Sequence, residues 1–182
     1  PGQFMVIEFS DVQGGRAWSM TNFVPGLTDC VDFVIKMKPG GELSNFLFDS
    51  HGLDKLLDQS VRVFGPIGKA VFDENISRDL VCIAGGTGIA SMMSILEAFS
   101  KKKNSTNSAS LFFGVRTQED VFFMDELTHL VRDSAGSMRV VIAFSDKAGS
   151  ADFIDAHEFI DFDQGFVHEV AMRQMDSWKT PQ

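Results

Sequence analysis

The sequence has little of several features that define large classes of protein. It has only two cysteines, Cys30 and Cys82, too few to hold an iron–sulfur cluster through the usual four thiolates. Both lie in apolar, strand-like runs, so we expect buried thiols rather than a disulfide. No apolar run is long enough to span a membrane, and the first residues lack the basic region of a signal peptide. We therefore expect a soluble, cytoplasmic protein.

Positive charge is also in short supply. The chain has 16 Lys and Arg against 25 Asp and Glu, a net charge of -9 at pH 7, which argues against nucleic acid as the main partner. Hydrophobic residues make up 44% of the 182 positions, enough to build a packed core in one domain or in two small ones.

The first part of the chain has the pattern of a β structure. Short strand-like runs alternate there with glycine and proline turns, which is typical of an antiparallel barrel or sandwich. The expected strands are residues 4–9, 17–20, 30–37 and 61–64.

Past about residue 75 the pattern changes to alternating strands and helices. Such alternation predicts a parallel sheet with right-handed crossovers. The expected strands are residues 80–84, 111–115 and 138–144, and the expected helices are residues 89–99 and 124–132.

A glycine-rich stretch joins the first of these strands to its helix. In "IAGGTGIASMMSIL" (Ile83–Leu96), Gly85, Gly86 and Gly88 free the backbone to turn sharply and to approach a ligand closely. Free N–H groups and the helix dipole would then form an anion site that suits a dinucleotide pyrophosphate. A plain strand-to-helix turn is the alternative, because glycine spacing alone is a weak signal.

Five segments of the chain together resemble a known family. In their order they are similar to the ferredoxin–NADP reductase-like flavoproteins, especially the NADH-dependent reductase components of bacterial multicomponent oxygenases. The segments are "RAWSMTN" (16–22), "GGELSNFL" (40–47), "VFGPIG" (63–68), "IAGGTGIASMMSIL" (83–96) and "FFGVRTQEDVFFMDEL" (112–127).

This resemblance implies a fold of two parts. Residues 1–75 would form an antiparallel FAD-binding β-barrel, and residues 76–182 a parallel-sheet, Rossmann-like NAD(P)-binding α/β domain. Family members begin the barrel with strands that precede "PGQF" and end with a strand carrying Cys-Gly-Pro. The resemblance therefore implies a truncated barrel without its opening strands and a nucleotide domain without its C-terminal strand.

The resemblance also assigns roles in the first half of the chain. Arg16 would bind the FAD pyrophosphate, for which a guanidinium is chemically suited. Ser19 would be the catalytic residue, with a hydrogen bond near N5 of the flavin. Trp18 stands where the family has tyrosine and keeps a surface for stacking. An ordinary strand with an exposed arginine and a core tryptophan is the alternative.

A second FAD contact is expected at "GGELSNFL". Gly41, Leu43 and Ser44 would bind the FAD pyrophosphate at the start of a short helix, where N–H groups are free. Ser44 as a simple helix N-cap is an equally good interpretation, and the two roles can coexist.

In the second half, the same likeness assigns the nucleotide site. Gly86, Thr87 and Gly88 would bind the NAD(P)H pyrophosphate, and Ser91 replaces a family proline in the first helical turn, with a small effect expected. Arg116 would lie where open α/β sheets bind ligands, or would simply cap the following helix.

The choice of nucleotide depends on the residues that follow the third strand. Asp146 would repel a 2′-phosphate and accept a hydrogen bond from a free ribose hydroxyl, which favours NADH over NADPH, although Lys147 beside it blurs the signal. The acidic run at residues 152–164 is interpreted as a solvated surface rather than a metal site around His157, so no metal is expected.

The function implied by the resemblance is electron transfer. Hydride would pass from NAD(P)H to FAD, and electrons would then pass to a ferredoxin-type iron–sulfur protein or an oxygenase component. Two other functions stay open. One is a reductase of free quinone or flavin, and the other is a non-catalytic flavin- or nucleotide-binding subunit of an electron-transfer complex.

Overall fold

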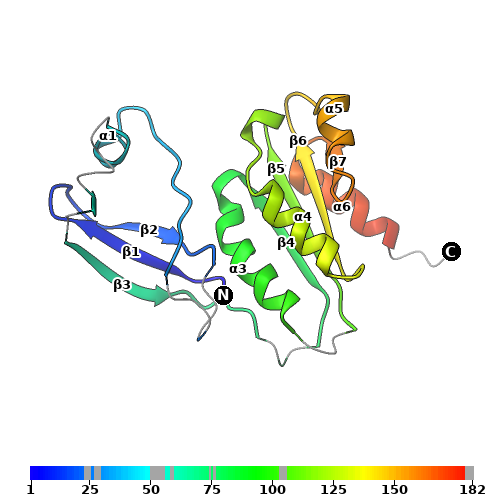
Figure 1. Ribbon diagram of the computed structural model, residues 1–182, viewed down its shortest axis with the longest axis horizontal. Coiled ribbons are helices and arrows are strands. Elements are labelled where there is room, and N and C mark those ends of the chain that lie inside the picture. The colour runs from blue at the N-terminus through cyan, green and yellow to red at the C-terminus, as the bar shows by residue number, and fades with distance from the viewer. Residues whose placement is uncertain are drawn as a thin grey trace.

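The computed structural model of the chain contains two sheets that lie side by side (Figure 1). One is an antiparallel sheet near the N-terminus, and the other is a parallel sheet flanked by helices. The described residues are 1–22, 26, 30–49, 56–57, 60–73, 75, 77–102 and 106–178.

The antiparallel sheet has the strand order β2-β1-β3. Its strands are β1 (Phe4–Phe9), β2 (Arg16–Ser19) and β3 (Val61–Ile67). The helix α1 (Glu42–Phe48) packs beside β1 and β2 and buries Leu43 and Leu47 against Val12. Of the strands expected here, residues 4–9 are confirmed without change.

The strand expected at residues 30–37 was wrong. Its only pairing is an isolated bridge between Phe33 and Met20. The physical reason is that the side chains of Val34, Ile35 and Lys36 line a cleft against the other half of the molecule. A segment that spans the two halves in this way is not free to join a ladder.

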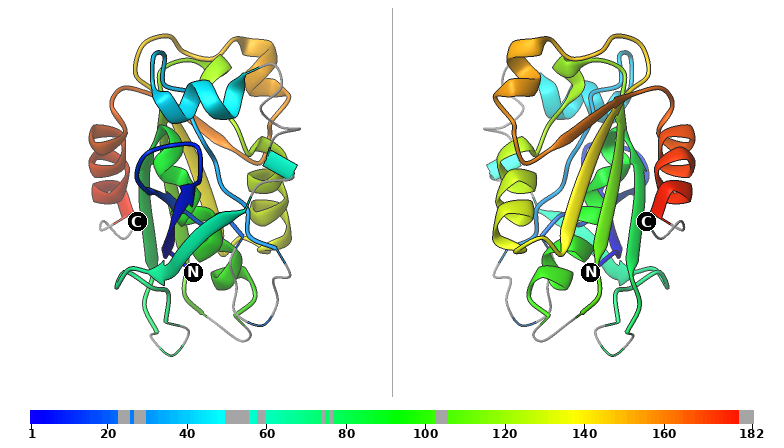
Figure 2. Two further views of the ribbon diagram at one scale, coloured as in Figure 1. Left: turned by 90° about the vertical axis from the view of Figure 1, so that its left-hand side faces the viewer. Right: turned by 90° about the vertical axis from the view of Figure 1, so that its right-hand side faces the viewer.

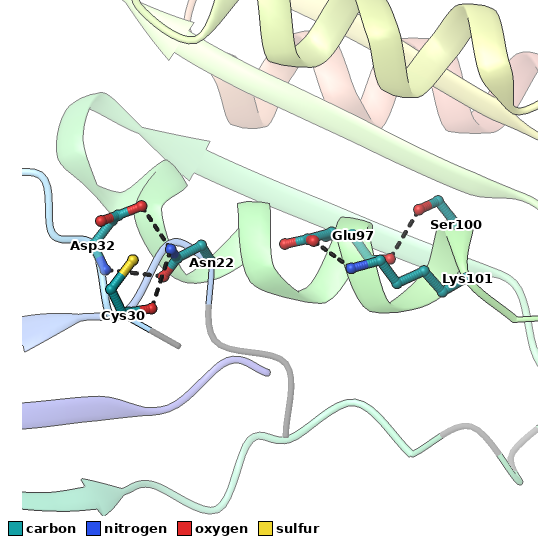
Figure 3. Close-up of polar contacts among 6 residues, drawn as sticks. All are labelled: Asn22, Cys30, Asp32, Glu97, Ser100 and Lys101. Carbon is teal, nitrogen blue, oxygen red and sulfur yellow. Dashed lines mark hydrogen bonds and ion pairs between the residues drawn. The ribbon is translucent and has the colours of Figure 1, made fainter. Parts of the chain in front are cut away.

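Cys30 also corrects an expectation, because it is exposed rather than buried. It lies in a turn held by Asn22, whose side chain donates to the Cys30 carbonyl and to the Asp32 carboxylate (Figure 3). Cys82 is buried, as expected, and burial raises the pKa of its thiol to about 11.

The parallel sheet has the strand order β4-β5-β6-β7. Its strands are β4 (Leu80–Gly85), β5 (Ala109–Val115), β6 (Met138–Phe144) and β7 (Asp161–Gln164). Two 3₁₀ turns, η1 (Gly86–Gly88) and η2 (Gln118–Asp120), follow β4 and β5. The helices are α3 (Ile89–Ser100), α4 (Met124–Asp133), α5 (Ala151–Asp155) and α6 (Val167–Trp178).

The main core lies on the two faces of this sheet. The helices α3 and α4 cover one face and α6 covers the other, as the end-on views show (Figure 2). Alternate residues of β5 therefore face opposite cores, with Phe113 on the α3 side and Phe112 against Val170 of α6. A sheet buried on both faces requires the continuous apolar runs that mark β5 and β6 in the sequence.

The sequence predicted a solvated surface for the acidic run at residues 152–164 but no helix or strand within it. It contains α5 and the fourth strand, β7, which the sequence did not predict. Phe162 of β7 stacks on Phe144 with ring centroids 5.9 Å apart, while Asp161 pairs with Arg139 at 2.6 Å. Only one apolar side chain of this four-residue edge strand reaches the core, so its pattern was too short to recognise.

His157 lies in a structural position in this segment. Its Nδ1 is 2.6 Å from the Phe153 carbonyl oxygen, and its ring packs on that of Phe153. Within the part of the chain that the structure describes, no group of His, Cys, Asp and Glu side chains has the arrangement of a metal site. None of the described helices is both long and apolar enough to cross a membrane.

Candidate functional site

A cleft of about 490 Å³ opens where the parallel strands end and the two halves of the molecule meet. One wall comes from the ends of β4, β5 and β6 and the turns that follow them. The opposite wall is Val34, Ile35 and Lys36 of the first half. The carboxyl edge of a parallel sheet is the usual ligand site of open α/β folds.

The glycine loop after β4 forms the base of this cleft. Gly86 has a left-handed φ of +50°, and Gly85, Gly86 and Gly88 each have open space where a Cβ would stand. The helix α3 begins directly after the loop, so the N–H groups of its first turn point toward the cleft end of the helix. The loop thus has both the room and the donors for an anionic ligand.

Two of the three predicted loop residues line this cleft. Gly86 and Thr87 line it, and Gly88 ends η1 at the start of α3. Ser91 stands in the first turn of α3, where its hydroxyl donates to the Gly88 carbonyl at 3.4 Å.

Gly114 of β5 has a role that the sequence did not indicate. A Cβ at this position would lie 2.7 Å from Cβ of Val167, the first residue of α6. Real Cβ atoms do not approach that closely, so the glycine is required for α6 to pack on the sheet. Its absence of a side chain also keeps the cleft open, because both Gly114 and Val167 line it.

Arg116 and Asp146, 30 positions apart, form an ion pair beside the cleft. Arg116 Nε and Nη2 lie 2.9 and 2.8 Å from Asp146 Oδ2, and the Asp146 N–H donates to the Arg116 carbonyl. The hydrogen bond and the charge of Asp146 raise the pKa of the Arg116 guanidinium. The Arg116 guanidinium therefore pairs with Asp146, rather than capping the following helix as the alternative interpretation had it.

The pair remains open to solvent. The Arg116 side chain is 77% exposed and lines the cleft. Since an exposed ion pair in water is weak, a ligand can displace either partner at little cost.

Sequence reasoning missed several charged residues of the cleft. Lys36 lies on the wall of the first half, and Glu119 and Asp120 lie on the wall of the second. A hydrogen bond from Thr117 is the main cause that lowers the pKa of Glu119. Nothing in the sequence around Lys36 indicates a binding residue. The strand predicted at residues 30–37 gave no reason to place Lys36 opposite the glycine loop.

The residues expected to bind FAD lie apart from the cleft, on β2 and around α1. Arg16 is exposed, and its Nη1 donates to the carbonyls of Gly14 and Gly15 at 3.1 and 3.2 Å. Trp18 is half-buried, with its ring centroid 6.1 Å from that of Phe9, and Ser19 ends β2.

The start of α1 corrects one interpretation. Gly41 is the N-cap and Ser44 lies inside the first turn, so Ser44 is not the cap. Its Oγ accepts from the Lys38 N–H at 2.9 Å, which closes the preceding turn. Leu43 is buried in the small core under α1, so only its backbone can face a ligand.

Comparison with known proteins identifies the second half. The family described as the oxidoreductase NAD-binding domain matches residues 82–179, which include the glycine loop, Arg116 and Asp146. The chain belongs to this family. The predicted likeness to ferredoxin–NADP reductase-like proteins is thereby confirmed.

Two curated relatives show the kind of protein in which this NAD-binding domain occurs. The chain is 33% identical to the ferredoxin–NAD(P)(+) reductase component of a naphthalene 1,2-dioxygenase system from Pseudomonas putida, over 73% of the chain and 38% of the relative. It is 32% identical to the ferredoxin–NAD(+) reductase component of an alkene monooxygenase system from Xanthobacter autotrophicus, over 80% of the chain and 42% of the relative. The chain thus spans about two fifths of the length of these relatives.

Solved structures confirm the predicted fold class. A ferredoxin reductase in carbazole 1,9a-dioxygenase matches 94% of this chain and 46% of its own, with a TM-score of 0.65 and 25% identity. A cytochrome P450 reductase from Amycolatopsis matches 95% of this chain and 48% of its own, with a TM-score of 0.75 and 21% identity. Both matches extend over the antiparallel half as well as the NAD-binding domain.

Proposed function

We propose that this chain is the flavin- and nucleotide-binding core of a reductase. NAD(P)H gives hydride to FAD, and electrons then pass to a ferredoxin-type iron–sulfur protein or an oxygenase component. Residues 1–75 form the flavin part and residues 76–182 the nucleotide part. The observation that carries this proposal is the cleft between the halves, with a glycine loop and a helix start at its base.

The nucleotide fits the residues of this cleft. Its pyrophosphate is bound by the N–H groups at Gly86, Thr87 and Gly88, where the two glycines leave open space beside the backbone. The Thr87 hydroxyl adds a donor. Lys36, on the facing wall, supplies a positive charge across the cleft from the loop.

The ion pair beside the cleft favours NADH over NADPH. Asp146 pairs with the guanidinium of Arg116, so a 2′-phosphate that approached Arg116 would also meet a negative charge. The same carboxylate is an acceptor for a free ribose hydroxyl. Replacing Asp146 with serine should release Arg116 and improve NADPH relative to NADH by about tenfold, measured as the ratio of the two dissociation constants.

The flavin part offers a partial but consistent set of contacts. Arg16 is exposed on β2, where a pyrophosphate would compete with the Gly14 and Gly15 carbonyls for its guanidinium. The first turn of α1, after Gly41, has no side-chain cap for its N–H groups. Ser19, at the end of β2, is the candidate for a hydrogen bond near the flavin N5. When bound, FAD supplies the hydride acceptor and the one-electron chemistry, while the protein orients it.

An anaerobic visible spectrum of the protein reconstituted with FAD and titrated with NADH tests the proposal. We expect retained flavin absorbance that bleaches as NADH is added. A matched pair of variants, Arg16→Ala and Arg62→Ala, separates flavin binding from general loss of surface charge, because Arg62 lies on β3 and pairs with Glu8.

The other outcomes select the alternatives. Retained flavin that does not bleach indicates a non-catalytic binding subunit. Full turnover with ferricyanide and quinone but none with a [2Fe–2S] ferredoxin indicates a reductase of free acceptors. A protein that binds neither FAD nor NADH contradicts the proposal.

A further inference from the structure

A direct hydrogen bond links the two halves at α3, the helix that begins after the glycine loop. The Gly2 N–H donates to the Ser94 Oγ at 2.9 Å, across 92 positions of sequence. Ser94 lies on α3 and is fully buried, with 0% of its surface exposed. In Figure 1 the N-terminal end of the chain lies beside this helix.

Gly2 fits this contact because it has no side chain. Its φ is +84°, and a Cβ there would lie 2.4 Å from the Ala70 carbonyl oxygen and 2.9 Å from Cδ1 of Ile95. The backbone at Gly2 is thus wedged between the chain that leaves β3 and the surface of α3. Both the left-handed conformation and the close approach require glycine.

The contact continues toward the glycine loop through hydroxyl groups. Ser94 Oγ donates to the Ser91 carbonyl at 3.0 Å, and Ser91 Oγ donates to the Gly88 carbonyl at 3.4 Å. Ser94 is thus connected through Ser91 to Gly88, the last residue of η1.

On another part of α3 the two halves leave a hollow. A second cavity of about 440 Å³ separates Asn22 and Asp32 of the first half from Glu97 and Ser100 of the helix. Figure 3 shows Asn22 beside α3 and two of its hydrogen bonds, both to Asp32. The two halves are thus loosely packed at this cavity and closely packed around Gly2.

We propose that Ser94 is a positioning residue. Its bond to Gly2 sets the antiparallel half against α3 and so holds the wall at Val34–Lys36 opposite the glycine loop. This inference rests on the proposed function for the ligand of the cleft. A cleft with walls from two halves binds an extended ligand only while the walls keep their spacing.

The test compares Ser94→Ala with Ser100→Ala. Both serines lie on α3 and donate to the carbonyl three residues earlier, Ser100 to Glu97 at 2.8 Å. Ser94 alone of the two accepts from Gly2. Gly2→Ala disrupts the same contact on the Gly2 side. The double variant with Ser94→Ala should lose little more nucleotide affinity than either single variant.

Two measurements are made on each variant. The first is calorimetric binding of NADH and of ADP, since ADP reports on the glycine loop without the nicotinamide end. The second is the distance between spin labels on the exposed Cys30 and on an introduced Met172→Cys, a position on α6 that is 67% exposed. The second needs no ligand.

We expect Ser94→Ala to weaken NADH about tenfold and ADP less than about twofold, because one buried hydrogen bond between the halves is lost. The distribution of distances between its spin labels should broaden, while Ser100→Ala should match the wild type in both measurements. Unchanged distances in Ser94→Ala and Gly2→Ala overturn the inference, as does an equal loss of NADH and ADP. If the wild type binds neither nucleotide, the proposed function fails, and the distances still decide whether Ser94 sets the halves.

Discussion

The two halves of this protein are packed to very different degrees. In the parallel sheet, Phe112, Phe113 and Phe144 are almost completely buried, and helices cover both faces. In the antiparallel sheet, every residue of β3 is exposed, including Val63 at 50% and Phe64 at 48%. The stability of the described structure therefore resides mainly in the NAD-binding half.

This difference has a functional meaning. The strand ends and glycine loop of the well-packed NAD-binding half line one wall of the cleft. The antiparallel half leaves several apolar side chains of β3 exposed to solvent. It supplies the facing wall and the residues proposed to bind the flavin.

The largest expected effect compares two phenylalanines. Phe113→Ala empties a fully buried site in the parallel sheet and should lower the free energy of unfolding by about 3–5 kcal/mol. Phe64→Ala on β3 should cost about 0.5 kcal/mol, because the side chain is already half in water. Urea unfolding measures both, and equal losses would refute the contrast between the halves.

Gly114→Ala tests how closely α6 packs on the sheet. The new Cβ would meet Val167 at 2.7 Å, and the overlap should destabilise the protein by about 1–3 kcal/mol. Gly85→Ala is the control, since its backbone is extended and a Cβ there would meet nothing within 4 Å. A Gly114→Ala variant as stable as the wild type would show that α6 moves freely.

The stability should fall at high pH through Cys82. Burial raises its pKa to about 11 from 9.0, so the unfolded chain loses this proton at lower pH than the folded one. Stability is then full below about pH 9 and declines toward pH 11, by about 1 kcal/mol between pH 8 and 10. The decline should be absent in Cys82→Ala, as measured by urea unfolding at the two pH values.

The cap of α5 gives a smaller effect. Ser150 Oγ accepts from the Phe153 N–H at 3.2 Å, and Ser150→Ala should cost about 1 kcal/mol. Ser145→Ala, whose hydroxyl lies 3.5 Å from Asp146, is the comparison and should change the melting temperature less. The reverse order would contradict the assignment of the cap.

Gly88→Ala should barely change stability and still affect function. Its φ of -61° is helical and a Cβ there has open space, so unfolding should shift by less than about 0.5 kcal/mol. Nucleotide affinity should fall about tenfold, because the backbone can no longer be approached closely. Calorimetry with ADP measures this, and unchanged affinity would remove Gly88 from the site.

The local pattern of the sequence was sufficient for the strongest elements. The β1 range and the β6 range at residues 138–144 agree with their predictions, and the glycine loop lies between β4 and α3 as expected. The reason is that continuous apolar runs and glycine turns specify their own conformation, with little help from distant residues.

Other features depended on contacts between distant segments. The strand β7 depends on the stacking of Phe162 on Phe144, which lies in another strand. The ion pair of Arg116 and Asp146 depends on the parallel pairing of β5 and β6, which brings the ends of these strands together. Lys36 gained its place from the approach of one half to the other. Local patterns were enough to predict the two kinds of sheet, most of their strands and the glycine loop between β4 and α3, because apolar runs and backbone freedom are local properties. Only the tertiary structure decided which charges share the cleft, because that depends on how elements far apart in the chain pack together.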